Sequence, residues 1–470
     1  MQANPINYSA LLPFVLGVSG LLAQSTSTAA LPNAPMTQSF LLGSAQAGPV
    51  TDSPAPAGTE GTSTPLTRQE AEKLALANNP RIRITALIAR VQHQAVRERR
   101  ADEFPNLNGN LTAVEANDGS RISSGSLTAS RLLEHAGMGV QLSQLITDFG
   151  HTRNLVASAK LQEKARLADA EASRLDIVLA TDQVFFAVIE SQEILKVAKQ
   201  TVNSRQTLAE QVSALTKAKL KSDLDNSFAQ VNLSQAKLLQ LDAQNNLDAA
   251  KAAFSAVLGY DKEMNFKLVD DSGSLPPVPP DADALIAQAI QNRPDLQSLK
   301  YSEQAAQKFS KAQHEQLLPT ISALGVVGGT PVGSSQYFTT NWYGAVGGNV
   351  SIPIFNGFRL TAQASEAALQ SKAATEQTRA LRDQVVRDVR TAWLNANTAM
   401  QRVTVTAELL KQANTALDLA KTRYDLGLSS IVELSQAELE QTEAAIGNAN
   451  ARSQYNFAIS TINFQTGVQP

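Results

Sequence analysis

Residues 150–218 read GHTRNLVASAKLQEKARLADAEASRLDIVLATDQVFFAVIESQEILKVAKQTVNSRQTLAEQVSALTKA, and neither a proline nor a further glycine follows Gly150 in this stretch. At a rise of 1.5 Å per residue, it can form a helix of about 100 Å. Residues 358–426 are a second such stretch of the same length. Aromatic residues make up only 5% of the chain and alanine is abundant, as in long, closely packed helices. The sequence therefore predicts two very long helices rather than a broad globular core.

These two stretches belong to an internal duplication. The segment AKLQEKA at 159–165 recurs as AALQSKA at 367–373, which is 208 residues later. Closer to the N-terminus, NNP at 78–80 recurs as NRP at 292–294, with an offset of 214. Repeats of about two hundred residues are too long for a solenoid, so they indicate a duplicated half-structure.

Shorter helices are predicted on both sides of each long one. In the first copy, Thr67 and Glu70 form a capping box, and Pro80 suits the first position of a new helix that ends before Pro105. After the long stretch, a return helix is expected at 222–258, and its counterpart at 430–466. In each copy the two shorter helices add to about 61 residues, so they can lie end to end beside the long one, with a gap of about 12 Å.

Four segments between the helices read as strands of about ten residues, the length of a tilted membrane-spanning strand. Tyr337, Phe338, Trp342 and Tyr343 cluster at the second hairpin, where an interfacial aromatic girdle would lie. Surface hairpins are the alternative, whereas a plain coiled coil leaves the segments unexplained. Because four strands cannot close a barrel and open edges do not occur in lipid, several chains would have to share one barrel. The segments are 107–116, 138–146, 320–328 and 343–352.

Composition argues against several classes of function. The net charge of −3 and the pI near 5.9 give no reason to expect a nucleic-acid partner. The absence of cysteine excludes disulfides and thiolate metal sites, and the 4 histidines show no ligand spacing. Neither a phosphate loop, a nucleophile elbow nor an HExxH motif occurs. We therefore expect no enzyme, no cofactor and no metal site.

The N-terminal region is expected to be an export signal followed by a linker. Residues 10–23 are an apolar run that is too short to span a bilayer but long enough for a secretory signal, although no Lys or Arg precedes it. The predicted layout is a signal peptide at 1–23, a Ser/Ala/Pro-rich linker at 24–65, a first repeat at 66–260 with a strand pair at 105–147 and a helical tip at 218–223, a linker at 261–280, and a second repeat at 281–470 with a strand pair at 319–355 and a tip at 425–430.

From about residue 66 to the C-terminus, the chain resembles the outer-membrane efflux protein family, the TolC-like channels. The motifs that carry the resemblance keep their order and spacing in both copies. They are Asn79-Pro80 and Arg293-Pro294-Asp295-Leu296 at the repeat starts, Pro105 and Pro319 before the strands, Ile354-Phe355-Asn356-Gly357 after the last strand, and RYDLGLSSIVEL at 423–434 in the second tip.

The resemblance implies a mixed α and β fold. It implies a homotrimer with a long α-helical barrel in the periplasm and four strands per chain in a shared twelve-stranded barrel in outer-membrane lipid. The implied function is a passive channel of a tripartite export system, with a periplasmic adaptor protein and an inner-membrane pump as partners. The alternative function is a periplasmic coiled-coil scaffold or adaptor without a channel.

The resemblance also implies roles for the helical tips. Glu433 matches a family position that forms an acidic ring at the periplasmic entrance, and Asp225 is its equivalent in the first copy, whereas the next acidic position of the family is Gln436 here. Capping boxes, Ser222 with Asp225 and Ser430 with Glu433, are a compatible alternative role. We expect the adaptor to dock at the tips, through Leu426, Gly427 and Leu428 in the second copy and Leu220 in the first, with Gly427 in a left-handed conformation.

Overall fold

The computed structural model describes residues 65–114, 121–122, 130–131, 135–262, 264, 266–269, 275–329 and 342–468. The signal peptide predicted at 1–23, nearly all of the linker predicted at 24–65, and the aromatic residues Tyr337 and Phe338 lie outside the described residues. No described helix combines the length and the low polarity that crossing a bilayer as a helix requires.

The two long helices predicted from the sequence are confirmed. Helices α3 (His151–Lys217) and α7 (Arg359–Asp425) have 67 residues each and start 208 residues apart. The shorter helices also occur in pairs, at the offset of 214 before the strands and of 208 after them. They are α1 (Arg68–Asn78) with α5 (Ala282–Asn292), α2 (Pro80–Ala101) with α6 (Pro294–Glu315), and α4 (Asp223–Val257) with α8 (Ile431–Thr466).

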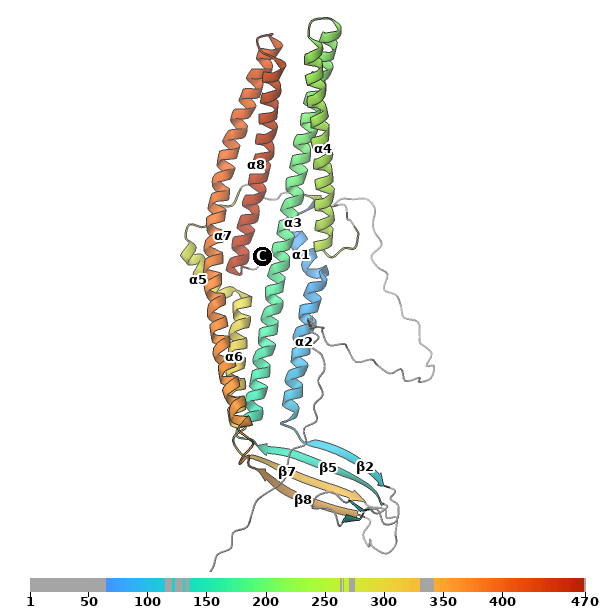
Figure 1. The fold of residues 1–470 in the computed structure, drawn as a ribbon, viewed down its shortest axis with the longest axis vertical. Coiled ribbons are helices and arrows are strands. Elements are labelled where there is room, and N and C mark those ends of the chain that lie inside the picture. Colours follow the sequence, from blue (N-terminus) through green and yellow to red (C-terminus); the bar gives the residue numbers. More distant parts are fainter. Residues whose placement is uncertain are drawn as a thin grey trace, which may run out of the picture. The chain divides into compact units, whose positions relative to one another are not determined.

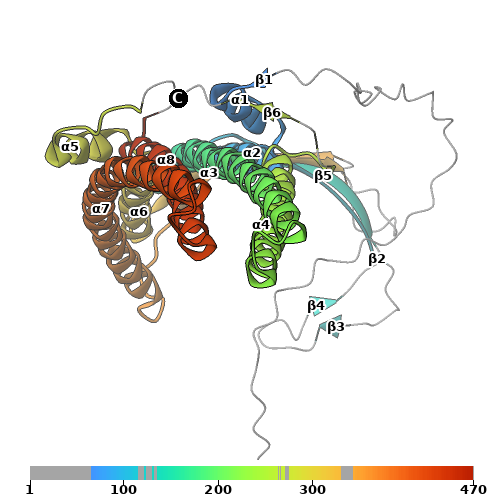
Figure 2. The ribbon, with the colours of Figure 1, turned by 90° about the horizontal axis from the view of Figure 1, so that it is seen from above.

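The helices form a row of four columns (Figures 1 and 2). Helix α3 packs against α2 and α4 on one side and against α6 and α8 on the other, and α7 packs against α6 and α8. The columns are therefore α2 with α4, then α3, then α6 with α8, then α7. This order confirms that two shorter helices lie end to end beside each long one. Helices α1 and α5 pack outside the row, on α3 and α7.

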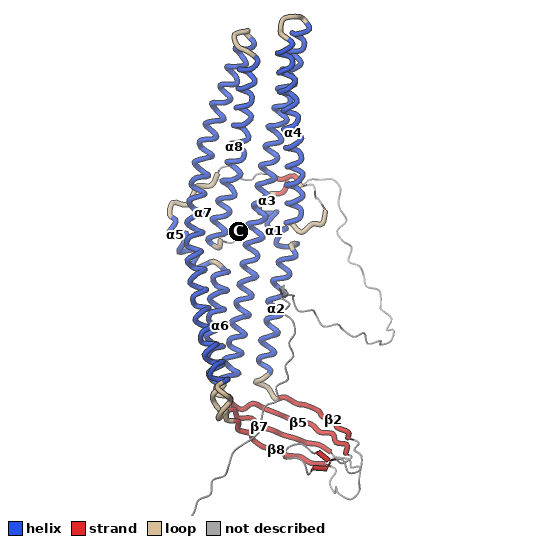
Figure 3. The backbone as a smooth tube through the Cα atoms, in the orientation of Figure 1, coloured by secondary structure: helices blue, strands red, loops and turns tan. Residues whose placement is uncertain are grey.

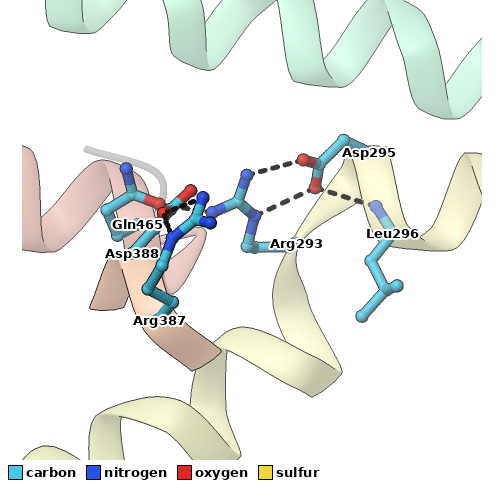
Figure 4. Close-up of polar contacts among 6 residues, drawn as sticks. All are labelled: Arg293, Asp295, Leu296, Arg387, Asp388 and Gln465. Carbon is cyan, nitrogen blue, oxygen red and sulfur yellow. Dashed lines mark hydrogen bonds and ion pairs between the residues drawn. The ribbon is translucent and has the colours of Figure 1, made fainter. Parts of the chain in front are cut away.

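The end-to-end joins are closed by side-chain hydrogen bonds and close backbone approach rather than left as the predicted gaps. In the first copy, the Asn79 side-chain amide donates to the Val257 carbonyl at 3.0 Å, and a Cβ on Gly259 would lie 3.0 Å from the Asn78 carbonyl oxygen. In the second copy, Arg293 is held by Asp295 and by Gln465 (Figure 4). The turns after α4 and α8 therefore fill the space that helix lengths alone left open.

Four long strands form one antiparallel sheet in the order β2-β5-β7-β8 (Figure 3). The strands are β2 (Asn106–Val114), β5 (His135–Thr147), β7 (Thr320–Gly329) and β8 (Trp342–Ser351). All four predicted strands are confirmed to within three residues at each end. Because β5 pairs with β7, the two copies share one sheet, and the strand order follows the order of the helix columns.

Short strands that the sequence analysis did not predict also occur. Strand β1 (Pro65–Leu66) pairs in parallel with β6 (Lys267–Leu268), so the boundary between the predicted N-terminal linker and the first repeat forms a small ladder with the predicted inter-repeat linker. Strands β3 (Arg121–Ile122) and β4 (Ser130–Arg131) pair with each other. A two-residue ladder has no periodicity that a sequence could reveal.

The join geometry generates a prediction about glycine. At Gly467, where φ is +70°, a Cβ would lie 2.9 Å from the Asn292 carbonyl carbon, so Gly467→Ala should destabilise the protein by more than the ~1 kcal/mol of a left-handed alanine. Gly447 lies inside α8 with nothing within 4 Å, so Gly447→Ala should stabilise it by about 1 kcal/mol. Thermal unfolding followed by circular dichroism checks both. Equal shifts of the two melting temperatures would contradict the close join.

Candidate functional site

One face of the four-stranded sheet is apolar and exposed. The strand registers place Leu107 beside Leu142, Leu111 beside Met138, and Val140 beside Val327 on this face. Val346 and Val350 of β8 continue the face, and the Val346 side chain is 93% exposed. The other seven residues named here are also exposed. Within the described residues, therefore, no part of this chain covers the apolar face.

The opposite face of the sheet is mostly polar. Asn106, Asn108 and Asn110 alternate with the leucines of β2, and the register continues their face through Gln141 and Ser143 of β5. On β8 the same alternation gives Asn349 and Ser351. Strands that alternate between apolar and polar residues in this way suit a wall between lipid and water.

Tyr343 and Trp342 are the described members of the predicted aromatic girdle. Both side chains are exposed. The Tyr343 ring lies over the glycines of neighbouring strands, because a Cβ added at Gly328 would come within 2.8 Å of the Tyr343 hydroxyl. Glycine at 328 therefore makes room for the ring. The register places Trp342 on the apolar face, beside Gly329, and Tyr343 on the opposite, polar face, beside Gly328. The membrane-interface role of Trp342 therefore stays a prediction, whereas Tyr343 faces away from the apolar surface.

Both helical hairpins end in the same backbone motif at the far end from the sheet. In the second tip, the Leu428 N–H donates to the Arg423 carbonyl at 2.8 Å and the Gly427 N–H to the Tyr424 carbonyl at 3.0 Å. Leu220 and Lys219 make the corresponding bonds in the first tip. This is the Schellman motif, which requires one left-handed residue.

The left-handed residue differs between the tips. Gly427 has φ of +74°, which confirms the expected left-handed glycine, whereas Lys219 occupies the equivalent position with φ of +59°. A non-glycine residue in this conformation costs about 1 kcal/mol. Leu426 and Leu428 are each 68% exposed, and Leu220 is exposed as well. Each tip thus presents apolar side chains to its surroundings.

The two predicted capping boxes differ in the structure. In the first copy the box is complete, because the Ser222 hydroxyl accepts from the Asp225 N–H at 3.1 Å and the Asp225 carboxylate accepts from the Ser222 N–H at 3.2 Å. In the second copy only half forms. The Ser430 hydroxyl accepts from the Glu433 N–H at 3.4 Å, but the Glu433 carboxylate lies 3.4 Å from Arg423 instead. The reciprocal cap predicted for Glu433 is therefore wrong.

A contact between the two tips was not predicted from the sequence. The Lys221 ammonium of the first tip lies 4.4 Å from the centre of the Tyr424 ring of the second. Tyr424 is 7% exposed, and its buried hydroxyl has no hydrogen-bond partner among the described residues. Burial, followed by the charges of Asp225 and Asp425, raises the pKa of Tyr424. Negative charges and a lysine from different hairpins thus meet around one aromatic ring.

Polar contacts between the hairpins run down from the tips, beside an apolar cluster to which both hairpins contribute. The Asn232 amide donates to the Ser435 hydroxyl at 2.6 Å, and the Thr201 and Thr442 hydroxyls lie 3.3 Å apart. Between them, Arg205 and Glu438 form a buried ion pair at 3.6 Å, and burial raises the pKa of Glu438. Over the residues that the structure describes, there is no cluster of three or more His, Asp or Glu side chains suited to a metal ion.

Comparisons with known proteins agree with this architecture. The profile of the family described as "Outer membrane efflux protein" matches residues 72–260 and 285–467. The outer membrane protein TolC of Escherichia coli (strain K12) is 24% identical over 414 residues, which cover 83% of this chain and 80% of that protein. The outer membrane protein OprJ of Pseudomonas aeruginosa is 25% identical over 373 residues, which cover 78% and 76%.

Solved structures share the fold. CusC superposes with a TM-score of 0.75 at 18% identity, covering 85% of this chain and 92% of that one. The CmeC outer membrane channel of Campylobacter jejuni gives 0.72 at 18% identity, covering 88% and 90%. The family profile matches well over half of the chain, in two segments that follow the internal duplication. The chain therefore belongs to the outer membrane efflux protein family.

Proposed function

We propose that this protein is the outer-membrane channel of a tripartite export system and passively conducts substrates that an inner-membrane pump and a periplasmic adaptor deliver. The observation that carries the proposal is the sheet with one exposed apolar face and one polar face. The apolar face suits contact with lipid, and the polar face suits the lining of a water-filled pore. If the protein were a periplasmic scaffold, the exposed apolar face of the sheet would be unexplained.

The working form is proposed to be a homotrimer. Among the described strands, β2 pairs only with β5 and β8 only with β7, so the sheet has two open edges. Unpaired backbone groups in lipid cost several kcal/mol each, so these edges need partners. Pairing β2 of one copy with β8 of the next makes a head-to-tail contact that can close into a ring. Three copies, the number that the family resemblance implies, give twelve strands.

Exposed apolar stripes on the end columns of the helix row support the same closure. On α2, Ile84, Leu87, Ile88 and Val91 are exposed and follow one helix face. On α7, an exposed stripe is formed by residues separated by nearly whole numbers of turns, which are Leu369, Leu394, Val405, Leu409 and Leu419. In a ring, the α2/α4 column of one copy would meet α7 of its neighbour.

We assign Glu433 to the periplasmic entrance. Its carboxylate is exposed and is not used as a reciprocal cap, and its ion pair with Arg423 at 3.4 Å lies among exposed side chains, where solvent screens it. Asp225 is bound within its own capping box, so we assign it to the helix start first and to the entrance second. Three copies would place three Glu433 carboxylates around one axis.

The tips are proposed as the docking surface for the adaptor. Leu426, Leu428 and Leu220 are exposed at the end of the helical row, and apolar side chains gathered in this way favour contact with a partner protein. Lysines 217, 219 and 221 surround Leu220, whereas Asp425 adjoins Leu426. The two tips should therefore make different contacts with the same partner.

The ring closure predicts a specific cross-link. Because the chain has no cysteine, a double variant with Leu107→Cys in β2 and Ile352→Cys after β8 offers one thiol at each open edge. Oxidation of the membrane fraction should give disulfide-linked trimers, which reductant reverses, and the purified trimer should conduct ions across planar bilayers. The two single variants serve as controls and should stay unlinked. Linked products that stop at the dimer, or a monomer with full conductance, would refute the trimer.

The entrance assignment predicts a change in ion block. Glu433→Gln should weaken block of the channel by multivalent cations, because up to three like charges disappear from one constriction. Helix content should stay the same, since the Ser430 hydroxyl still accepts from the backbone N–H of residue 433. Glu433→Asp keeps the charge and is the matched control for single-channel recordings. Unchanged cation block in Glu433→Gln would remove Glu433 from the entrance.

The docking assignment predicts an asymmetry between the tips. Gly427→Lys gives the second tip the residue of the first, adds a charge beside Leu426 and Leu428, and strains the left-handed position by about 1 kcal/mol. It should abolish export in cells while the isolated trimer still assembles and conducts. The reciprocal change, Lys219→Gly, relieves strain and should leave export intact. Normal export by the Gly427→Lys variant would show that the adaptor docks elsewhere.

A further inference from the structure

Two carboxylic acids lie buried together between α1 and α3. Glu72 of α1 and Asp182 of α3 are each 2% exposed, although they are 110 residues apart in the chain. Apolar residues of one core cluster surround the contact between the two helices, among them Ala71, Ala75 and Phe185. Two ionised carboxylates in such a place repel each other and lack water, so their protonation has to be accounted for.

One guanidinium contacts both acids. The Arg68 Nη1 atom donates to Glu72 Oε1 at 2.6 Å and to Asp182 Oδ2 at 3.1 Å. One positive charge balances only one of the two carboxylates. The Asp182 Oδ1 atom is buried and has no hydrogen-bond partner among the described residues. The site thus has one negative charge too many and one acceptor without a donor.

A proton on Glu72 would correct both deficits. Burial, followed by the hydrogen bond and the charge of Asp182, raises the pKa of Glu72 to about 7, while Arg68 and Lys73 act in the opposite direction. Arg68, Lys73 and Asp182 are the charged groups that act on Glu72 in the described part of the chain. A protonated Glu72 carries no charge and can donate a hydrogen bond to Asp182.

The second repeat lacks this arrangement. At the offset of 214, Ala282 and Ile286 of α5 replace Arg68 and Glu72, and at the offset of 208, Arg390 of α7 replaces Asp182. Ile286 is buried against Val385 and Val389, and Arg390 forms an ion pair with Asp283 at 3.0 Å among exposed side chains. The same helix docks through apolar contact in one repeat and through a buried acid pair in the other.

We propose that Glu72 and Asp182 bind one proton between them and that this proton latches α1 onto α3, which makes the docking of α1, but not that of α5, sensitive to pH.

The docking of α1 also affects the join between α2 and α4. The turn after α1 holds the end of α4, through the bond from Asn79 to Val257 and the close approach of Gly259 to Asn78. Loosening α1 therefore loosens the first end-to-end join.

The direction of the pH effect follows from the two states of Glu72. When α1 is undocked, Glu72 is in water with its ordinary pKa of 4.5, and when α1 is docked the pKa is about 7. The docked state binds the proton more tightly, so the latch is fully present below pH 4.5. Docking weakens as the pH rises from 4.5 through 7 and changes little above that range. Over pH 5 to 8, the docking equilibrium should fall by at least about tenfold.

Matched cysteines in this cysteine-free chain can measure the docking. Ala75 of α1 and Ala289 of α5 are equivalent in the two repeats, and both are fully buried. The measured quantity is a ratio of two rates in the full-length trimer: the rate at which a thiol reagent labels Ala75→Cys, divided by the rate for Ala289→Cys. Because both thiols share the same intrinsic pH dependence, the ratio reports the opening of α1. This ratio should rise about tenfold or more between pH 5 and 8.

Two second-site variants decide whether the acid pair causes the rise. Glu72→Gln can still donate to Asp182 and accept from Arg68, so it should keep α1 docked and make the ratio independent of pH. Asp182→Asn should make the rise smaller, because it removes the charge of Asp182 and its hydrogen bond with Glu72, but should not abolish it, because Glu72 stays buried. A ratio that does not change with pH in the parent, or that still rises in Glu72→Gln, would overturn the latch. Amide hydrogen exchange of 68–78 relative to 282–292 gives the same comparison without cysteines, and a flat ratio there would also overturn it.

Discussion

The architecture depends on the need of every strand edge and helix face to find a partner. In the described residues, one chain supplies the four strands of the main sheet and four helix columns in the same order, and both the sheet and the row end without a neighbour. The open edge of β2 and the exposed apolar stripe of α2 lie at one end of the sheet and of the row. The open edge of β8 and the stripe of α7 lie at the other end. In the proposed ring, one association between copies would therefore pair the backbone of the sheet edges and cover the side chains of the helices together. In the proposed ring, the duplicated chain would form one segment of a closed wall.

Much of this architecture could be predicted from the sequence, because its signals are local. Prolines at 80, 105, 294 and 319 punctuate the helices, and the long stretches without glycine or proline became α3 and α7 with one residue of error at each end. Matching helix lengths then predicted the columns. The closed joins could not be foreseen, because they depend on how turns at Gly259 and Gly467 approach backbone more than 170 residues away in the sequence.

The candidate site was less predictable, because each polar side chain there has more than one possible partner. Both tips have a serine followed three residues later by an acidic residue, Ser222–Asp225 in the first copy and Ser430–Glu433 in the second. The longer Glu433 side chain nevertheless reaches Arg423 across the tip. Aligning the copies at the offset of 208 places Lys219 on Gly427, and that comparison could have revealed the left-handed lysine. The pairing of Glu72 with Asp182 left no such trace, because only the docking of α1 brings the two residues together.

The duplication also shows which parts of the chain tolerate a change in length. The offset between the copies is 214 up to β2 and β7 and 208 from α3 and α7 onward, so the six-residue difference falls between the strands of one hairpin. A residue inserted into α3 would shift its whole seam against the α2 and α4 column, and only a matching insertion in that column could restore the contacts. Insertions and deletions in related lineages should accumulate in the strand-connecting loops, whereas helix lengths should change only as coordinated sets. The fold thus separates a region free to diverge from one in which evolution must alter several helices together.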